Sequence, residues 1–119
     1  MVLMQPHDLG RKKIVLITGC DSGHGLNVAE HLAFFHRDTH VIATVKDPFS
    51  EGATKLYKLQ QLNIRVYQLD VTSELDISMM EDRVKRTIEE ENGVLWALIN
   101  NAATFGYANL EGTTPEHMK

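Results

Sequence analysis

Along the chain, short runs of β-branched and aliphatic residues alternate with longer segments in which apolar residues recur every three or four positions. The short runs predict strands and the longer segments predict helices, because side chains share a face every two residues in a strand and every 3.6 in a helix. The strands are expected at residues 13–18, 41–45, 64–69 and 94–99. The helices are expected to begin near Leu26, after the break at Lys46-Asp47-Pro48, and at Thr72 or Ser73.

The helical segments also indicate their ends and their buried faces. Asp76 follows Ser73 by three residues, which predicts a capping box around Ser73, and Gly93 is expected to end that helix. Core-facing positions are expected at Leu26, Ala29, Leu32, Ala33 and Phe35 in the first helix. The second helix is expected from the helical pattern of Leu56, Leu59 and Leu62.

Strands that are apolar on both faces and separated by helices belong to a parallel sheet covered on both sides. Right-handed crossovers give such a chain the strand order 3-2-1-4. We therefore expect an α/β protein with a doubly wound parallel sheet, incomplete at about four strands. In that order the strand at 94–99 is a long apolar edge, which natural sheets usually cover or pair.

The segment between the first strand and the first helix is rich in glycine. It reads Thr18-Gly19-Cys20-Asp21-Ser22-Gly23-His24-Gly25. Glycines let the backbone turn tightly and let a pyrophosphate approach, and the N–H groups at the helix start attract its charge. The strand–turn–helix context predicts a dinucleotide site, in which valine at Gly25 is expected to block the approach of the pyrophosphate. A tight connection without a ligand is the alternative.

The last residues of the chain resemble the beginning of another helix. Thr113-Thr114-Pro115-Glu116 combines a threonine cap with proline at the first helical position, and only His117-Met118-Lys119 follow. So short a helix is not stable alone. Residues 1–119 are therefore expected to be the N-terminal part of a single dinucleotide-binding domain, truncated before its end.

Composition and charge narrow the classes of partner. The chain of 119 residues is 43% hydrophobic and 24% charged, as in soluble globular proteins, and its net charge of −4 argues against nucleic acid and anionic membranes. The single cysteine fits a reducing compartment, and no signal peptide or membrane segment is evident, so a cytoplasmic location is expected. The six histidines show no metal-ligand pattern, so no metal is expected.

Three motifs, in this order, resemble those of the short-chain dehydrogenase/reductase family. The turn at 18–25 matches Thr-Gly-x-x-x-Gly-x-Gly, Leu69-Asp70-Val71-Thr72 resembles the adenine-binding segment after the third strand, and Asn100-Asn101-Ala102-Ala103 is similar to Asn-Asn-Ala-Gly. The turn and the segment at 95–101 look closest to the retinol and hydroxysteroid dehydrogenase branch. Ala103 departs from the last glycine of its motif, and its methyl group is expected to crowd the nicotinamide ribose or change the backbone.

The resemblance implies a Rossmann fold that binds a nicotinamide dinucleotide. Ser22 would offer a hydroxyl near the adenosine ribose, Asp70 would accept from the adenine amino group, and Asn101 would pass under the nicotinamide ribose. Asn101 is also expected to tie strand ends together, and a purely structural role of Asn100 and Asn101 is the alternative. The cofactor-binding residues implied in this way are Gly19, Ser22, Gly23, His24, Gly25, Lys46, Asp70, Val71, Asn101, Ala102 and Ala103.

The choice of cofactor is expected to depend on the end of the second strand. NAD enzymes usually carry an acid there, about 20 residues past the glycine turn, which binds the ribose 2′-hydroxyl. This chain has Thr44-Val45-Lys46-Asp47. Val45 cannot bind a hydroxyl and Lys46 can pair with a 2′-phosphate, which favours NADP, whereas Asp47 leaves NAD open. Lys46 as an ordinary solvated lysine is the alternative.

The catalytic groups that the resemblance implies are a Tyr-x-x-x-Lys pair, an upstream serine and an asparagine. None of Tyr57, Tyr67 and Tyr107 has a lysine four residues later, so no catalytic residue is assigned in this chain. The parent protein is expected to oxidise or reduce a small hydrophobic alcohol or ketone, retinoid- or steroid-like, with a homo-oligomer left open. The alternative is a truncated or inactive module that binds a dinucleotide or another subunit without turnover.

Overall fold

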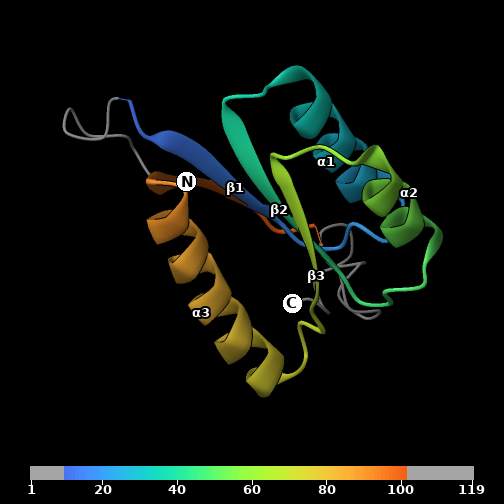
Figure 1. Ribbon diagram of the computed structural model, residues 1–119. Coiled ribbons are helices and arrows are strands. Elements are labelled where there is room, and N and C mark those ends of the chain that lie inside the picture. The colour runs from blue at the N-terminus through green and yellow to red at the C-terminus, as the bar shows by residue number, and fades with distance from the viewer. Residues whose placement is uncertain (1–9, 102–119) are drawn as a thin grey trace, which may run out of the picture.

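The computed structural model describes residues 10–101, which form a parallel sheet with helices on both faces (Figure 1). The elements in chain order are β1 (Lys12–Ile17), α1 (Gly23–Phe35), β2 (Thr39–Val45), α2 (Glu51–Leu59), β3 (Ile64–Gln68), α3 (Glu74–Glu90) and β4 (Gly93–Ile99). The strand order is β3-β2-β1-β4, and each neighbouring pair is parallel. The predicted fold class and strand order are confirmed.

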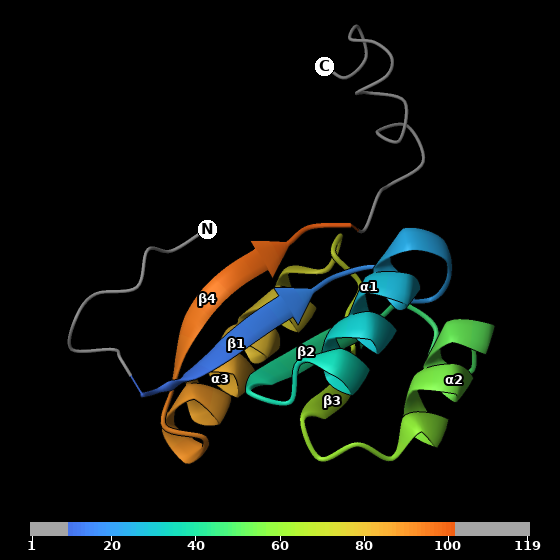
Figure 2. The same ribbon diagram turned by 90° about the horizontal axis from the view of Figure 1, so that it is seen from above.

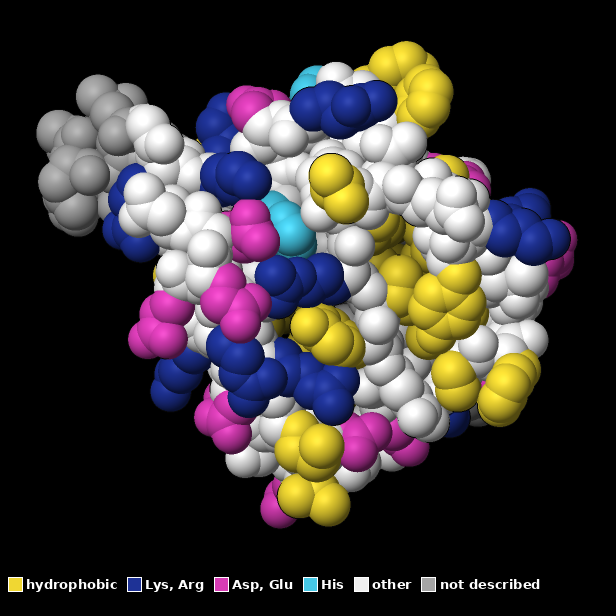
Figure 3. All heavy atoms as spheres, in the orientation of Figure 1, with side chains coloured by type: hydrophobic (Ala, Val, Ile, Leu, Met, Phe, Trp, Pro, Cys, Tyr) yellow, Lys and Arg dark blue, Asp and Glu magenta, His cyan; other side chains and the backbone are white. Residues whose placement is uncertain are grey.

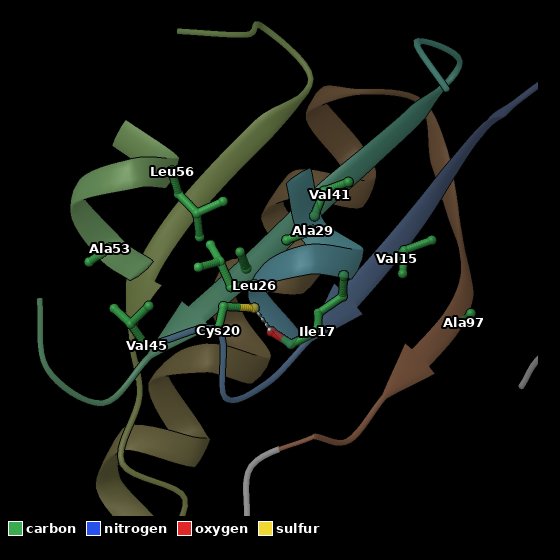
Figure 4. Close-up of a cluster of buried hydrophobic side chains, with 11 residues drawn as sticks. Val15, Ile17, Cys20, Leu26, Ala29, Val41, Val45, Ala53, Leu56 and Ala97 are labelled. Atoms are coloured by element: carbon green, nitrogen blue, oxygen red, sulfur yellow. Dashed lines mark hydrogen bonds between the residues drawn. The ribbon is translucent and has the colours of Figure 1, made fainter. Parts of the chain in front are cut away.

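Two layers of apolar side chains hold the helices to the sheet. Helices α1 and α2 lie on one face and α3 lies on the other (Figure 2). Beneath α1 and α2 the core includes Ile17, Leu26, Ala29, Val41, Val45, Ala53 and Leu56 (Figure 4). Beneath α3 it includes Ile14, Ile42, Leu69, Met80 and Val84. Strand β2 is buried at every position, because it lies inside the sheet and is covered on both faces.

Phe35, which was expected to face the core, and Leu62, which was expected in the second helix, are both exposed. Phe35 is the last residue of α1 and is 64% exposed. Leu62 is 98% exposed because α2 ends at Leu59 and the left-handed Gln60, with φ 51°, turns the chain away. Helical spacing alone did not show where the second helix ends.

The start of α3 is tied to the loop after β3. The Ser73 hydroxyl accepts a hydrogen bond from Asp76 N at 3.1 Å, as the predicted cap requires. The Asp76 carboxylate, however, accepts from Asp70 N at 2.9 Å, and Ser73 N donates to the Asp70 carbonyl at 2.9 Å. The reciprocal half of the predicted box is therefore wrong, and Asp76 holds the loop instead.

The end of α3 also differs from the expectation for Gly93. Asn92 takes the left-handed conformation, with φ 51°, whereas Gly93 is the first residue of β4. A Cβ at Gly93 would lie 2.5 Å from Ile14 Cδ1, so this glycine serves the close packing of β4 on β1.

The edge and the outer surface complete the fold. In the described part of the chain β4 pairs with β1 alone, which confirms the predicted edge strand, and Leu98 is 53% exposed there.

Basic and acidic side chains intermingle over α3 in the space-filling view (Figure 3). Within residues 10–101, none of the helices is both long and apolar enough to span a bilayer. The helix start expected at 113–116 lies outside the described residues.

Candidate functional site

The turns that follow the strands meet at one edge of the sheet, because the strands are parallel (Figure 2). This edge gathers the glycine turn, Lys46, Asp70 and Asn101, which are far apart in the sequence. The order of the strands reverses between β1 and β4, since β2 and β3 lie on one side of β1 and β4 on the other. Ligands of open α/β sheets bind in the crevice at such a reversal.

The three glycines of the turn have different tasks. Gly19 and Gly23 are left-handed, with φ 70° and 64°, and a Cβ at Gly23 would meet nothing within 4 Å. A Cβ at Gly25 would instead lie 2.5 Å from the Gly19 carbonyl oxygen and 2.6 Å from Asn101 Nδ2. Gly25 therefore allows α1 to pack on the strand ends. A valine there would collide with the protein itself, which corrects the expected reason for its effect.

The amino end of α1 suits an anionic group. The 13-residue helix begins at Gly23, three residues earlier than expected, and Ser22 precedes it as N-cap. Within the described chain the Ser22 side chain accepts no capping hydrogen bond, and the first turn carries no acid. The first N–H groups of a helix lack intrahelical partners and carry partial positive charge. With Ser22, Gly23 and His24 exposed, these donors fit a phosphate.

Hydrogen bonds join the turn after β1 to the end of β4. Thr18 Oγ1 donates to Asn100 Oδ1 at 2.9 Å and accepts from Asn101 N at 3.0 Å. Asn101 Nδ2 donates to the Gly19 carbonyl at 3.1 Å. The prediction that Asn101 ties strand ends together is confirmed, whereas its contact with a nicotinamide ribose stays a prediction. Ala102 and Ala103 lie outside the described residues.

Asp70 lies just past β3, beside the half-buried Val71. Its Oδ1 accepts from Thr72 Oγ1 at 2.6 Å and from Thr72 N at 2.9 Å. These two hydrogen bonds, together with the charge of Lys46, hold the pKa of the Asp70 carboxyl below its usual range. The group is therefore an ionised acceptor at neutral pH, which fits its predicted role toward an adenine amino group.

The end of β2 contains a contact that sequence reasoning missed. Val45 is fully buried, and Lys46 and Asp47 are exposed. The Asp21 carboxylate accepts from Lys46 N and from Asp47 N, each at 2.9 Å. The signal available in the sequence was an acid within the glycine turn.

Gly52, in the first turn of α2, was also missed. Its N–H donates to the Asp21 carbonyl at 2.8 Å, and a Cβ there would collide with the Asp21 and Cys20 carbonyl oxygens. A glycine inside a helix is unfavourable, and this was the signal for a close backbone approach.

Cys20 is a packing residue of the turn. It is fully buried, and its Sγ donates to the Ile17 carbonyl at 3.5 Å (Figure 4). Burial raises the pKa of the thiol to about 12, so the thiolate needed for nucleophilic attack is absent at neutral pH. Among the described residues, no cluster of three or more histidine, cysteine and acidic side chains could hold a metal ion.

Comparison with known proteins gives a consistent result. The family model described as short chain dehydrogenase matches residues 13–119. The chain is 32% identical over 110 residues to the mitochondrial D-beta-hydroxybutyrate dehydrogenase of Bos taurus, which covers 90% of this chain and 31% of that protein. It is 39% identical over 93 residues to 11-beta-hydroxysteroid dehydrogenase type 2 of Bos taurus, which covers 76% of this chain and 21% of that protein.

The fold is also that of a solved carbonyl reductase. The NADPH bound enzyme from chicken fatty liver matches with a TM-score of 0.69 and 30% identity, over 91% of this chain and 40% of that chain. The present chain thus spans less than half of each of these three relatives.

Proposed function

The chain belongs to the short-chain dehydrogenase/reductase family and has hydroxysteroid dehydrogenases among its relatives, and from this premise we propose that it binds a nicotinamide dinucleotide as the cofactor-binding part of an oxidoreductase. The observation that carries the proposal is the turn of left-handed glycines between β1 and α1, held to β4 by Asn101. The open space beside Gly23 and the free N–H groups of α1 fit a pyrophosphate.

Each strand end has a task in this proposal. The amino end of α1 binds the pyrophosphate, Asp70 and Val71 hold the adenine, and Asn101 orients the nicotinamide ribose. The hydrogen bonds of Thr18 with Asn100 and Asn101 fix β1 relative to β4, so the two halves of the site keep their spacing. The nicotinamide, when bound, supplies or accepts the hydride.

The substrate class belongs to the parent protein. We propose a hydrophobic alcohol or ketone, in keeping with the hydroxysteroid dehydrogenases and the carbonyl reductase that the chain resembles. The second candidate function is dinucleotide binding without turnover, which rests on the glycine turn alone and needs no catalytic residue. Lys46 supports NADP as the cofactor and Asp47 supports NAD. A cytoplasmic location and a homo-oligomer of the parent protein are part of the same proposal, tested by subcellular fractionation and by light scattering.

The test is a titration of the full chain with NADH and NADPH, followed by nicotinamide fluorescence. We expect saturable binding, and we expect Gly23→Val to weaken it at least about tenfold, because a side chain then enters the open space of the turn. Gly10→Val is the matched control, since Gly10 is also left-handed, with φ 90°, and also has no heavy atom within 4 Å of an added Cβ.

Both substitutions carry a comparable backbone strain, of about 1–2 kcal/mol. Only Gly23→Val is expected to change binding. A wild-type chain that unfolds cooperatively yet binds neither dinucleotide would overturn the proposal. Equal losses in the two variants would remove its assignment to the glycine turn.

A further inference from the structure

Asp21 connects the glycine turn to the loop that follows β2 through three hydrogen bonds. Its Oδ1 accepts from Lys46 N and its Oδ2 from Asp47 N, both at 2.9 Å, and its carbonyl oxygen accepts from Gly52 N at 2.8 Å. The absence of a side chain at Gly52 lets α2 approach this closely. One residue therefore fixes both the beginning of the loop and the start of α2.

The place of this carboxylate bears on the choice of cofactor. In dinucleotide-binding sheets, the residue about 20 positions past the glycine turn, at the end of the second strand, meets the ribose 2′ group. Lys46 and Asp47 occupy that position here, and the Asp21 oxygens lie 2.9 Å from their backbone nitrogens. Two N–H groups that a 2′-phosphate would otherwise use as donors are already bound.

The charges around Lys46 also disfavour a 2′-phosphate. Asp47 Oδ1 accepts from Phe49 N at 2.9 Å, so this carboxylate serves its own loop. Lys46 lies close enough to Asp70 to favour the ionised form of its carboxyl. Lys46 therefore already acts on the charge of Asp70, and the Asp21 carboxylate binds the backbone of Lys46 and Asp47, so three carboxylates and one ammonium belong to this group. A 2′-phosphate would add negative charge to this group, whereas a 2′-hydroxyl adds none and donates to a carboxylate.

We infer that Asp21 determines the cofactor preference of this site, favouring the 2′-hydroxyl of NAD(H) over the 2′-phosphate of NADP(H). The inference rests on the proposed dinucleotide function and reverses the preference that Lys46 alone predicts. Asp21 acts in two ways: it occupies the backbone donors of Lys46 and Asp47, and it places its own charge beside the ribose.

The test measures the ratio of the NADPH and NADH dissociation constants of the full chain by fluorescence titration. We expect the wild type to bind NADH at least about tenfold more tightly. Asp21→Asn removes the charge and keeps the size, and it is expected to lower the ratio about tenfold, mainly through tighter NADPH binding. Asp38→Asn, an exposed acid before β2 at the opposite end of the sheet, is the control and is expected to leave the ratio unchanged.

A second measurement needs no variant, so it holds even where Asp21→Asn fails to fold. Competition against bound NADH uses 5′-AMP and adenosine 2′,5′-bisphosphate, and 5′-AMP is expected to compete better with the wild type. Tighter wild-type binding of NADPH, or an equal loss of both cofactors in Asp21→Asn, would overturn the inference and leave the proposed function standing. Binding of neither cofactor to folded wild type would instead refute the proposed function.

Discussion

His40, in β2, is a buried ionisable side chain that lies away from the glycine turn. It is 2% exposed, and among the described residues its buried Nε2 has no hydrogen-bond partner. Its Nδ1 lies 4.0 Å from Glu91 Oε1, but Glu91 also binds Lys12 at 3.0 Å and Arg65 at 3.2 Å. Burial lowers the pKa of His40. The charge of Glu91 raises this pKa, and the charges of Arg65 and Lys12 lower it further.

This shift predicts a pH-dependent stability. Because the pKa of His40 is lower in the folded state than its ordinary 6.5, the unfolded chain takes up the proton first as the pH falls. Stability is complete above pH 6.5 and is lost as the pH falls toward the folded-state pKa, with a limiting slope of about 1.4 kcal/mol per pH unit. Chemical denaturation between pH 8 and pH 5 measures it.

His40→Leu removes the titration and is expected to flatten the profile in this window. His31→Gln, an exposed histidine of α1, is the control and is expected to keep the wild-type slope. Parallel profiles for the wild type and His40→Leu would contradict the assignment.

For single residues, the sequence predicted the backbone conformation of a local turn but not a contact between distant loops. The left-handed Gly19 and Gly23 were predictable, since their conformation is a local property of a tight turn. The contact of Asp21 with Lys46 and Asp47 was not, because it joins residues 25 and 26 positions apart and depends on how two loops meet above the sheet.

At the scale of elements, each of the three helices within residues 10–101 has a serine as N-cap, but only two of these serines accept a capping hydrogen bond. Ser50 accepts from Ala53 N and Ser73 accepts from Asp76 N, each at 3.1 Å, whereas the Ser22 side chain accepts none within the described residues. Ser50→Ala and Ser73→Ala are each expected to lower the free energy of unfolding by about 1 kcal/mol. Ser22→Ala is expected to change it by less than about 0.5 kcal/mol.

Urea denaturation without cofactor measures all three variants. Equal losses would show that the free hydroxyl of Ser22 is also structural, and would weaken the assignment of this helix end to a ligand.

Strands were easier to predict than helix ends. The strands β1, β2, β3 and β4 were each placed within two residues, and the reason is clearest for β2, since a strand covered on both faces needs continuous apolar sequence. Helix ends depend on left-handed residues such as Gln60 and Asn92, whose conformation follows from packing around them. Gly93 was misassigned because its small size serves contact with Ile14 and not a turn.

At the scale of the whole molecule, the described residues 10–101 leave the face beside α3 only partly filled. A groove of about 840 Å³ runs between α3 and the strands β1 and β4. Its apolar lining includes Leu16, Leu69, Val71, Ile77, Met80, Val84, Ile88, Leu95 and Leu98. Exposed apolar surface next to an unpaired strand edge promotes association between chains.

We therefore expect the 119-residue chain to bind a hydrophobic dye such as anilinonaphthalene sulfonate and to self-associate as its concentration rises. Leu98→Lys, on the edge strand, is expected to reduce both effects. Leu62→Lys is the control, because Leu62 is 98% exposed on a loop outside the groove and is expected to change neither. A chain that is monodisperse at high concentration and binds no dye would contradict this prediction.

The hydrogen bond from Asn101 to Gly19 has a consequence for the order of events during synthesis. The two residues are 82 positions apart, so the glycine turn leaves the ribosome long before its partner does. A nascent chain that ends before Asn101 contains every glycine of the turn but cannot complete its hydrogen bonds. Affinity for the dinucleotide should therefore arise late and abruptly, when β4 pairs with β1, and it can serve as a readout of finished folding in chains of increasing length.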